Sequence, residues 1–210
     1  MSLLEDSWKQ REEQIYPSLF GGAGEGIYLL DASLFNNQFD IDDIDPRWLH
    51  YGVFKYAPTS DRNTWVYVSS GMSNAWEVDT LEEYSGLGTE FILEMDKDSD
   101  WAIDILRRLV AFNILVSVGF YGDKPLLDYG DRIPVSIEPN ISSLMIVQSN
   151  KFPKNFKLIS GKVDILQVTG ITAKELEYAK ANSSEMLVNK LFESQNAFTL
   201  KANRSSVVWL

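Results

Sequence analysis

The chain has 210 residues, of which 45 % are hydrophobic and 23 % charged, as in folded globular proteins, and this excludes disorder as its default state. Its 30 acidic and 19 basic side chains leave a formal net charge of −11, which argues against binding to nucleic-acid phosphates or to an anionic membrane. Because the chain contains no cysteine, disulfides, thiolate nucleophiles and cysteine-ligated metals are also excluded.

The first segment, residues 1–26, predicts a helix followed by a loop. Residues 2–14 have the pattern of a charged amphipathic helix, and Pro17 is expected to end it because proline cannot continue a helix. The sequence GGAGEG (21–26) lacks the Gly-Lys-Ser/Thr ending of a phosphate-binding loop, so we interpret it as a plain flexible loop. The N-terminus also lacks the basic-then-apolar order of a signal peptide, and we expect a soluble cytoplasmic protein.

The next part of the chain is rich in strand signals. β-branched and aromatic residues predict four strands, at 27–31, 50–57, 64–70 and 89–95. In the last of these, Glu90 and Glu94 alternate with apolar residues, which indicates one wetter face.

The clearest helix begins after Ser99 or Asp98, either of which can cap its first turn. Apolar residues recur at the spacing of a buried helical face until the helix ends near Gly119: Trp101, Ile105, Leu106, Leu109, Phe112 and Val116. We expect this helix to lie across a sheet as the central core element.

The C-terminal part predicts strands at 132–137 and 143–149, and a further pair of strands within 156–169 that turns near Ser160 and Gly161. Thr172 and Glu175 form a capping box that begins a helix, and Ser183 or Ser184 begins another. Residues 27–210 therefore predict one α+β domain, with a mixed, mostly antiparallel sheet packed against one long central helix and further C-terminal helices.

No catalytic, cofactor or metal site emerges from the residue patterns. His50, the only histidine, lies between aromatic residues, and VSSGMS lacks the glycine that a nucleophile elbow needs two residues before its serine. A hydrolase that uses His50 with Ser69 or Ser70 remains an open alternative. The aspartates of residues 39–46 lack the central glycine of a calcium-binding loop.

The acidic residues offer a different kind of candidate, a contact surface for a basic partner. They fall in two segments that we expect to be exposed loops, the second of which carries a tryptophan that we also expect at the surface. The candidate residues are Asp40, Asp42, Asp43, Asp45, Trp76, Glu77, Asp79, Glu82 and Glu83.

Several segments, in this order, resemble the suppressor-of-fused-like family. They are WLHYGVF (48–54), WVYVSSGMS (65–73), YSGLGTEFILEM (84–95) and DILQVTGITAKELEYAK (164–180). The YGDRIPVSI stretch (129–137) is also similar, and the resemblance covers roughly residues 48–192.

The resemblance implies a protein-binding domain rather than an enzyme. The animal protein of this family restrains a transcription factor by gripping an extended peptide between two domains, and this chain resembles only the first. Short single-domain bacterial relatives resemble immunity proteins, which neutralise a cognate toxin, often a nuclease, by direct contact. The expected function is therefore an immunity (antitoxin) protein for a basic toxin domain, and the alternative is a peptide-binding scaffold that restrains a regulatory protein.

Overall fold

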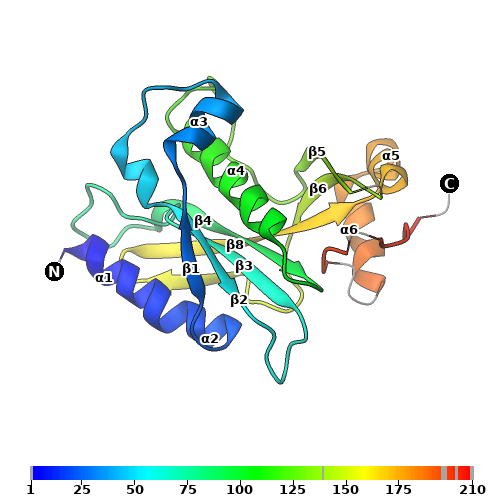
Figure 1. Ribbon diagram of the computed structural model, residues 1–210, viewed down its shortest axis with the longest axis horizontal. Coiled ribbons are helices and arrows are strands. Elements are labelled where there is room, and N and C mark those ends of the chain that lie inside the picture. Colours follow the sequence, from blue (N-terminus) through cyan, green and yellow to red (C-terminus); the bar gives the residue numbers. More distant parts are fainter. Residues whose placement is uncertain (1, 139, 195–197, 202, 209–210) are drawn as a thin grey trace.

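The computed structural model describes residues 2–138, 140–194, 198–201 and 203–208. Its centre is a twisted sheet in which the strand order is β1-β2-β3-β4-β8-β6-β5 (Figure 1). The strands are β1 (Glu25–Leu29), β2 (Gly52–Tyr56), β3 (Trp65–Ser70), β4 (Tyr84–Met95), β5 (Arg132–Glu138), β6 (Ile141–Val147), β7 (Asn155–Leu158) and β8 (Gly161–Ile171).

One strand pairing accounts for the mixed character of the sheet. β4 and β8 run parallel, whereas the other pairs of neighbouring strands are antiparallel. The other edge of β8 pairs with two strands. β7 pairs with the first half of that edge, and β6 pairs with the second half. The expected α+β class and the mostly antiparallel sheet are therefore confirmed.

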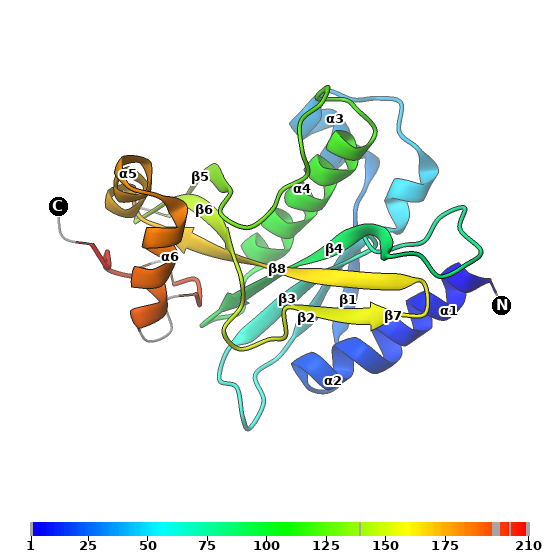
Figure 2. The ribbon, with the colours of Figure 1, turned by 180° about the vertical axis from the view of Figure 1, so that it is seen from behind.

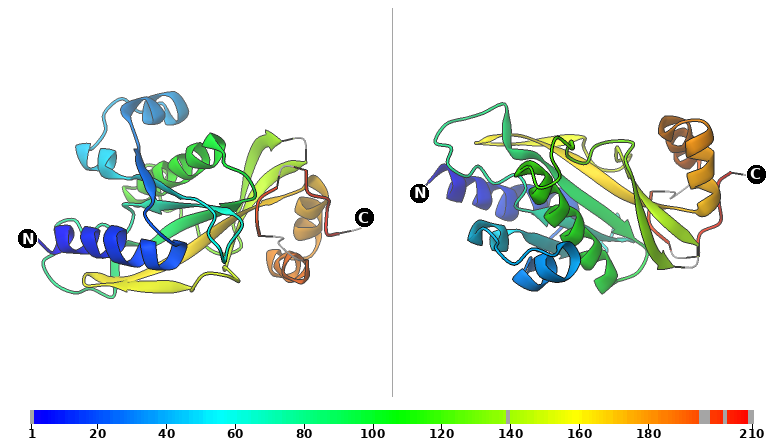
Figure 3. Two further views of the ribbon diagram at one scale, coloured as in Figure 1. Left: turned by 60° about the horizontal axis from the view of Figure 1, so that its bottom comes forward. Right: turned by 90° about the horizontal axis from the view of Figure 1, so that it is seen from above.

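Helices cover both faces of this sheet. They are α1 (Leu3–Lys9), the π-helical segment η1 (Gln10–Ile15), α2 (Tyr16–Phe20), α3 (Ala32–Phe39), the 3-10 helix η2 (Pro46–His50), α4 (Asp100–Ser117), α5 (Ala173–Ala181) and α6 (Ser184–Glu193). α4 and α3 lie on one side of the sheet, and the continuous helix formed by α1, η1 and α2 lies on the other (Figure 3).

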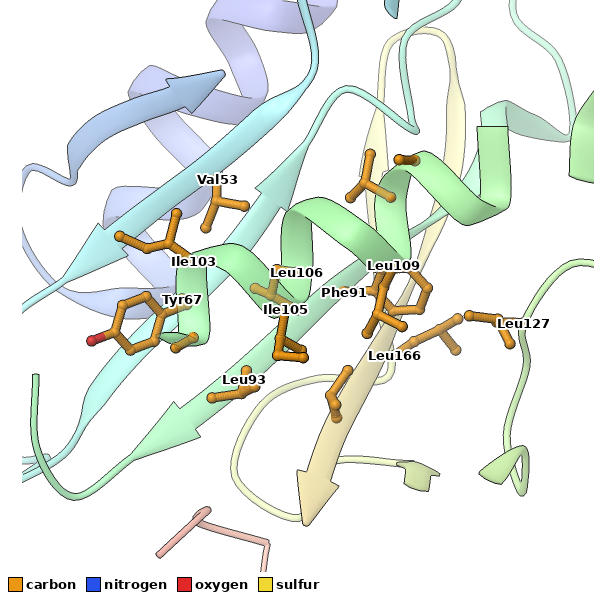
Figure 4. Close-up of a cluster of buried hydrophobic side chains, with 14 of the residues drawn as sticks. Val53, Tyr67, Phe91, Leu93, Ile103, Ile105, Leu106, Leu109, Leu127 and Leu166 are labelled. Atoms are coloured by element: carbon orange, nitrogen blue, oxygen red, sulfur yellow. The ribbon is translucent and has the colours of Figure 1, made fainter. Parts of the chain in front are cut away.

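The main core lies between α4 and the sheet, as the apolar pattern of that helix predicts. Leu106 and Leu109 of α4 pack over Phe91 and Leu93 of β4 and Leu166 of β8 (Figure 4). The helix begins after Ser99, but the expected side-chain cap is absent, and the Ser99 N–H instead donates to the Tyr67 hydroxyl at 2.7 Å. That bond attaches the start of α4 directly to β3.

The opposite face of the sheet is buried by the N-terminal helix. Tyr16 and Phe20 are its buried aromatic residues, and they pack against strands β2, β3, β7 and β8. The expectation that one side of β4 faces solvent is therefore wrong. The N-terminal helix covers Glu90, and Lys151 contacts Glu94, so both glutamates are almost completely buried.

The N-terminal helix ends later than the sequence predicted. It continues through Pro17 to Phe20, and the proline directly follows a π-helical turn, in which the Tyr16 N–H donates to the Arg11 carbonyl. α3, which the sequence did not predict, is an additional helix capped by Asp31.

At the other end of the sheet, α5 and α6 pack against β6 and the end of β8 (Figure 2). The predicted capping box is confirmed, because the Glu175 N–H donates to the Thr172 hydroxyl at 3.3 Å and the Thr172 N–H donates to the Glu175 carboxylate at 2.8 Å. Ser183 caps α6, as expected.

Candidate functional site

The two acidic segments lie at the same end of the molecule, beside the start of the N-terminal helix (Figure 2). The first, residues 40–45, connects α3 to η2, and the second, residues 76–83, connects β3 to β4. Asp40 ends α3 in a left-handed conformation with φ 58°, and Glu77 has φ 60°. These are the non-glycine residues with positive φ in the described part of the chain, so both unusual backbone positions fall within the acidic segments.

Arg47 connects the two segments. Its Nη2 lies 2.5 Å from Oδ2 of Asp45, and its Nη1 lies 2.7 Å from Oε1 of Glu77. The hydrogen bonds from Arg47 hold the pKa of the Asp45 carboxyl below its ordinary value. Sequence reasoning missed Arg47, although an arginine two residues after an aspartate is a weak local signal for such a pair.

Most of the candidate carboxylates form no ion pair within the described residues. Seven of the nine residues are exposed and two, Asp45 and Trp76, are half-buried; the exposed ones are Asp40, Asp42, Asp43, Glu77, Asp79, Glu82 and Glu83. Within the described part of the chain, Asp45 and Glu77 are the only two of these carboxylates that form ion pairs. We name the exposed set together with Asp45 the acidic end.

Trp76 is not the exposed loop residue that the sequence suggested. Its ring packs against Trp8 and His50, with centroids 5.8 Å and 6.1 Å away, and its indole N–H donates to the Tyr51 hydroxyl at 2.9 Å. His50 itself is exposed at the end of η2 rather than on a strand. The aromatic cluster of Trp8, His50 and Trp76 therefore attaches the second acidic segment to the N-terminal helix.

A buried polar cluster lies next to this end and was not anticipated. Glu90 accepts hydrogen bonds from the N–H groups of Gly71 and Ser73 and from the Ser73 hydroxyl, at 2.6–3.0 Å. Arg11, which is 1 % exposed, donates to the Ser73 hydroxyl and to Oδ1 of Asn74, both at 2.9 Å. No local sequence pattern predicted that this arginine is buried.

This cluster also engages the serines of the hydrolase alternative. Ser69 donates to Glu90 at 2.5 Å, and Ser70 donates to Glu12 at 2.7 Å. In the part of the chain that the structure describes, His50 contacts two tryptophan rings and makes no hydrogen bond to either serine. The geometry therefore does not bring these residues together as nucleophile and base.

A second feature on the surface is an apolar groove of about 860 Å³ between α4 and the β5–β6 hairpin. Phe39, Trp101 and Phe112 contribute aromatic walls. β5 is the last strand in the sheet order, so one of its edges has no neighbouring strand among the described residues. The groove therefore borders the strand that carries this open edge.

Taken together, the fold is a single mixed sheet with helices on both faces, and its surface carries an acidic end and an apolar groove. Among the helices of the described residues, none combines the length and apolarity that a membrane span requires. This is the class of α+β domain that the sequence predicted.

The chain belongs to the suppressor of fused family. The family profile described as "Suppressor of fused protein (SUFU)" matches residues 47–205, which confirms the resemblance expected from the sequence. This match excludes the N-terminal helix, β1, α3 and the aspartates of residues 40–45. A search by sequence against curated proteins finds no match.

Solved structures support the same fold. A putative SUFU homologue from Neisseria gonorrhoeae is similar with a TM-score of 0.65 and 19 % identity, over 97 % of this chain and 98 % of that one. Drosophila Suppressor of Fused has a TM-score of 0.57 and 19 % identity over 84 % of this chain, which spans only 49 % of that protein. The Sufu–Fu complex has a TM-score of 0.54 and 20 % identity, over 84 % of this chain and 88 % of that one.

Proposed function

We propose that this chain is a non-enzymatic protein-binding domain of the immunity type, and that its acidic end binds a basic face of a cognate toxin domain. The carrying observation is that Arg47 joins two loops that are 30 residues apart in sequence into one surface of exposed, mostly unpaired carboxylates. A surface of this kind attracts a basic partner and repels acidic ones. It would also compete with nucleic acid for the basic site of a nuclease.

Two comparisons support this proposal. The similarity to the short Neisseria homologue extends over 97 % of this chain, whereas the chain spans about half of the Drosophila protein. A related protein, Sufu, has been solved in complex with Fu, which supports a protein as the partner. The toxin identity of the partner follows from the resemblance to short bacterial members of the family.

The test is capture of partners from the source cells with the tagged protein, followed by mass spectrometry. A four-charge variant of the acidic end, D40N/D42N/D43N/D79N, should lose a stoichiometric basic partner that the wild type retains at low salt. The matched control removes four exposed charges elsewhere, as E13Q/D123N/E185Q/E193Q, and should retain it. Equal capture by both variants, or a captured partner that is acidic, contradicts the proposal.

The second candidate function is a peptide-binding scaffold, and the groove beside β5 favours it. An extended peptide can add to an open strand edge while its alternate side chains enter a neighbouring groove. This reading predicts binding of a short linear peptide and its loss in Trp101→Ala, because Trp101 lines the groove. Screening a linear peptide library against both proteins tests it, and a partner that binds only as a folded domain contradicts it.

A further inference from the structure

A pocket of about 430 Å³ lies within the second acidic segment, between the residues that follow β3 and the first residues of β4. Its lining combines aromatic and aliphatic side chains with two carboxylates. The side chains at its wall include those of Tyr51, Met72, Val78, Glu82, Glu83 and Tyr84, together with Trp76. Glu82 and Glu83 are exposed, whereas Tyr51 and Met72 are buried.

Backbone contacts hold this pocket in shape. Gly86, at φ 57°, brings the start of β4 so close to the opposite segment that a Cβ there would lie 2.5 Å from the Asn74 carbonyl oxygen. The Leu87 N–H donates to the Met72 carbonyl at 2.7 Å, and the Glu82 N–H donates to the Ser160 carbonyl at 3.1 Å. A pocket fixed by main-chain bonds loses little conformational entropy when a ligand enters it.

The chemistry of the lining favours a cation with an extended stem. Neither Glu82 nor Glu83 forms an ion pair within the described residues, so their charges are available to a ligand. Tyr84 already attracts a cation, since Nζ of Lys162 lies 4.3 Å from its ring centroid. Nζ of Lys162 also lies 3.3 Å from Oδ2 of Asp164, so this carboxylate partly balances the charge of the lysine.

Asn74 adds a polar group to the wall. This residue is 3 % exposed, and its Oδ1 accepts from Trp8 and Arg11. Its Nδ2 has no acceptor among the described residues.

We infer that this pocket receives an arginine side chain of the protein partner, and this inference rests on the proposed function. A guanidinium stacks on aromatic rings and forms paired hydrogen bonds with a carboxylate, and its apolar stem packs on aliphatic walls. An arginine anchored in a preformed pocket is a common hot spot of protein interfaces. The acidic end then supplies long-range attraction, and the pocket supplies the specific contact.

The pocket can be tested without the partner, using the blocked peptide Ac-Gly-Arg-Gly-NH2 as the probe. The readout is a ¹H–¹⁵N NMR titration of the tryptophan indole signals, with the Trp76 signal assigned through Trp76→Phe. The arginine peptide should shift the Trp76 signal saturably. The same peptide with citrulline, which is nearly isosteric but neutral, should bind about tenfold more weakly because it lacks the charge.

Two variants link the signal to this pocket. Glu82→Gln/Glu83→Gln should weaken arginine binding about tenfold and abolish the preference over citrulline, since both side chains are exposed and the fold does not depend on them. Glu185→Gln/Glu193→Gln, which removes two exposed charges on α6, should leave binding unchanged. Equal shifts with both peptides, or wild-type binding by Glu82→Gln/Glu83→Gln, overturn the inference.

A pocket-filling variant separates this inference from the proposed function. Val78→Trp keeps every charge of the acidic end but occupies the pocket, so it should lose both the peptide and the partner. If it captures the basic partner as well as the wild type does, the inference fails while the proposed function stands. If the arginine peptide binds as expected but capture is indifferent to D40N/D42N/D43N/D79N, the pocket stands and the proposed function fails.

Discussion

Arg11 and Glu90 are buried side by side, with Nη1 of the arginine 3.8 Å from Oε1 of the glutamate, although 79 positions separate them in the chain. The guanidinium comes from the N-terminal helix and the carboxylate from the central strand β4. This contact and the hydrogen bonds around it attach the N-terminal helix to the sheet.

The first prediction concerns this pair. Arg11→Met should lower the free energy of unfolding by about 3–5 kcal/mol, because it leaves the Glu90 charge buried without its partner. Urea denaturation measures the change, and Arg108→Met, an exposed change on α4, should stay within about 0.5 kcal/mol of the wild type. In Arg11→Met/Glu90→Gln the loss should be smaller than the sum of the two single losses. Strict additivity would mean that the two groups do not interact.

The second prediction concerns the C-terminal segment, which Glu175 attaches to α5. Burial alone would raise the pKa of the Glu175 carboxyl, but the hydrogen bonds and charge of Arg204 outweigh it, so this pKa lies below its ordinary value. Because the folded pKa is depressed, the stabilisation is fully present above the unfolded pKa of about 4.3 and is lost as the pH falls through the folded pKa.

Glu175→Gln should therefore be less stable than the wild type by about 1.5–3 kcal/mol at neutral pH, where the charged hydrogen bonds to Arg204 are intact. The difference should shrink in strongly acidic solution, as followed by urea denaturation across a pH series. Glu177→Gln is the control, because Glu177 forms only an exposed pair with Lys180 at 2.8 Å. A difference that stays constant with pH would contradict the assignment.

The third prediction concerns Gly86 and the pocket that it shapes. Gly86→Ala places a Cβ 2.5 Å and 2.6 Å from the carbonyl oxygens of Asn74 and Met72, which are backbone atoms that cannot turn aside. Gly22→Ala is the control, since Gly22 has φ 77° but, apart from its chain neighbours, no residue comes within 4 Å of the added carbon.

The control should lose about 1–2 kcal/mol from the left-handed backbone alone. Gly86→Ala should lose about 1–3 kcal/mol more, because the clash forces the two segments apart. Thermal and urea unfolding give both values. Similar losses in the two variants would show that the close approach adds nothing.

The fourth prediction concerns the aspartates of residues 40–45. In D40N/D42N/D43N/D45N, association with a basic partner should slow by about tenfold at low salt, and the rate should depend less steeply on ionic strength. Stopped-flow mixing across a salt series measures this, and the dissociation rate should change less. Because Asp45 is already paired with Arg47, most of the effect should come from the other three residues. Wild-type kinetics at every salt concentration would exclude steering by this loop.

Local sequence patterns were sufficient to predict those helices and strands whose defining residues lie only a few positions apart. The apolar residues of α4 recur every three or four positions, and Thr172 and Glu175 are three residues apart, so helical geometry alone places their side chains. The strands at β2, β3, β4, β6 and β8 were likewise predicted from β-branched and aromatic runs, although their boundaries moved by a few residues.

The tertiary structure decided which polar residues are buried and which loops meet. Arg11, Glu90 and Glu94 have the spacing of solvent-facing residues, and only the helix and loop that cover the second face of the sheet bury them. Arg47 can join Asp45 and Glu77 only because the connections after α3 and β3 end on the same side. Acidity, fold class and the central helix follow from composition and short-range periodicity. The acidic end and its pocket depend on contacts between distant segments, which no local period encodes.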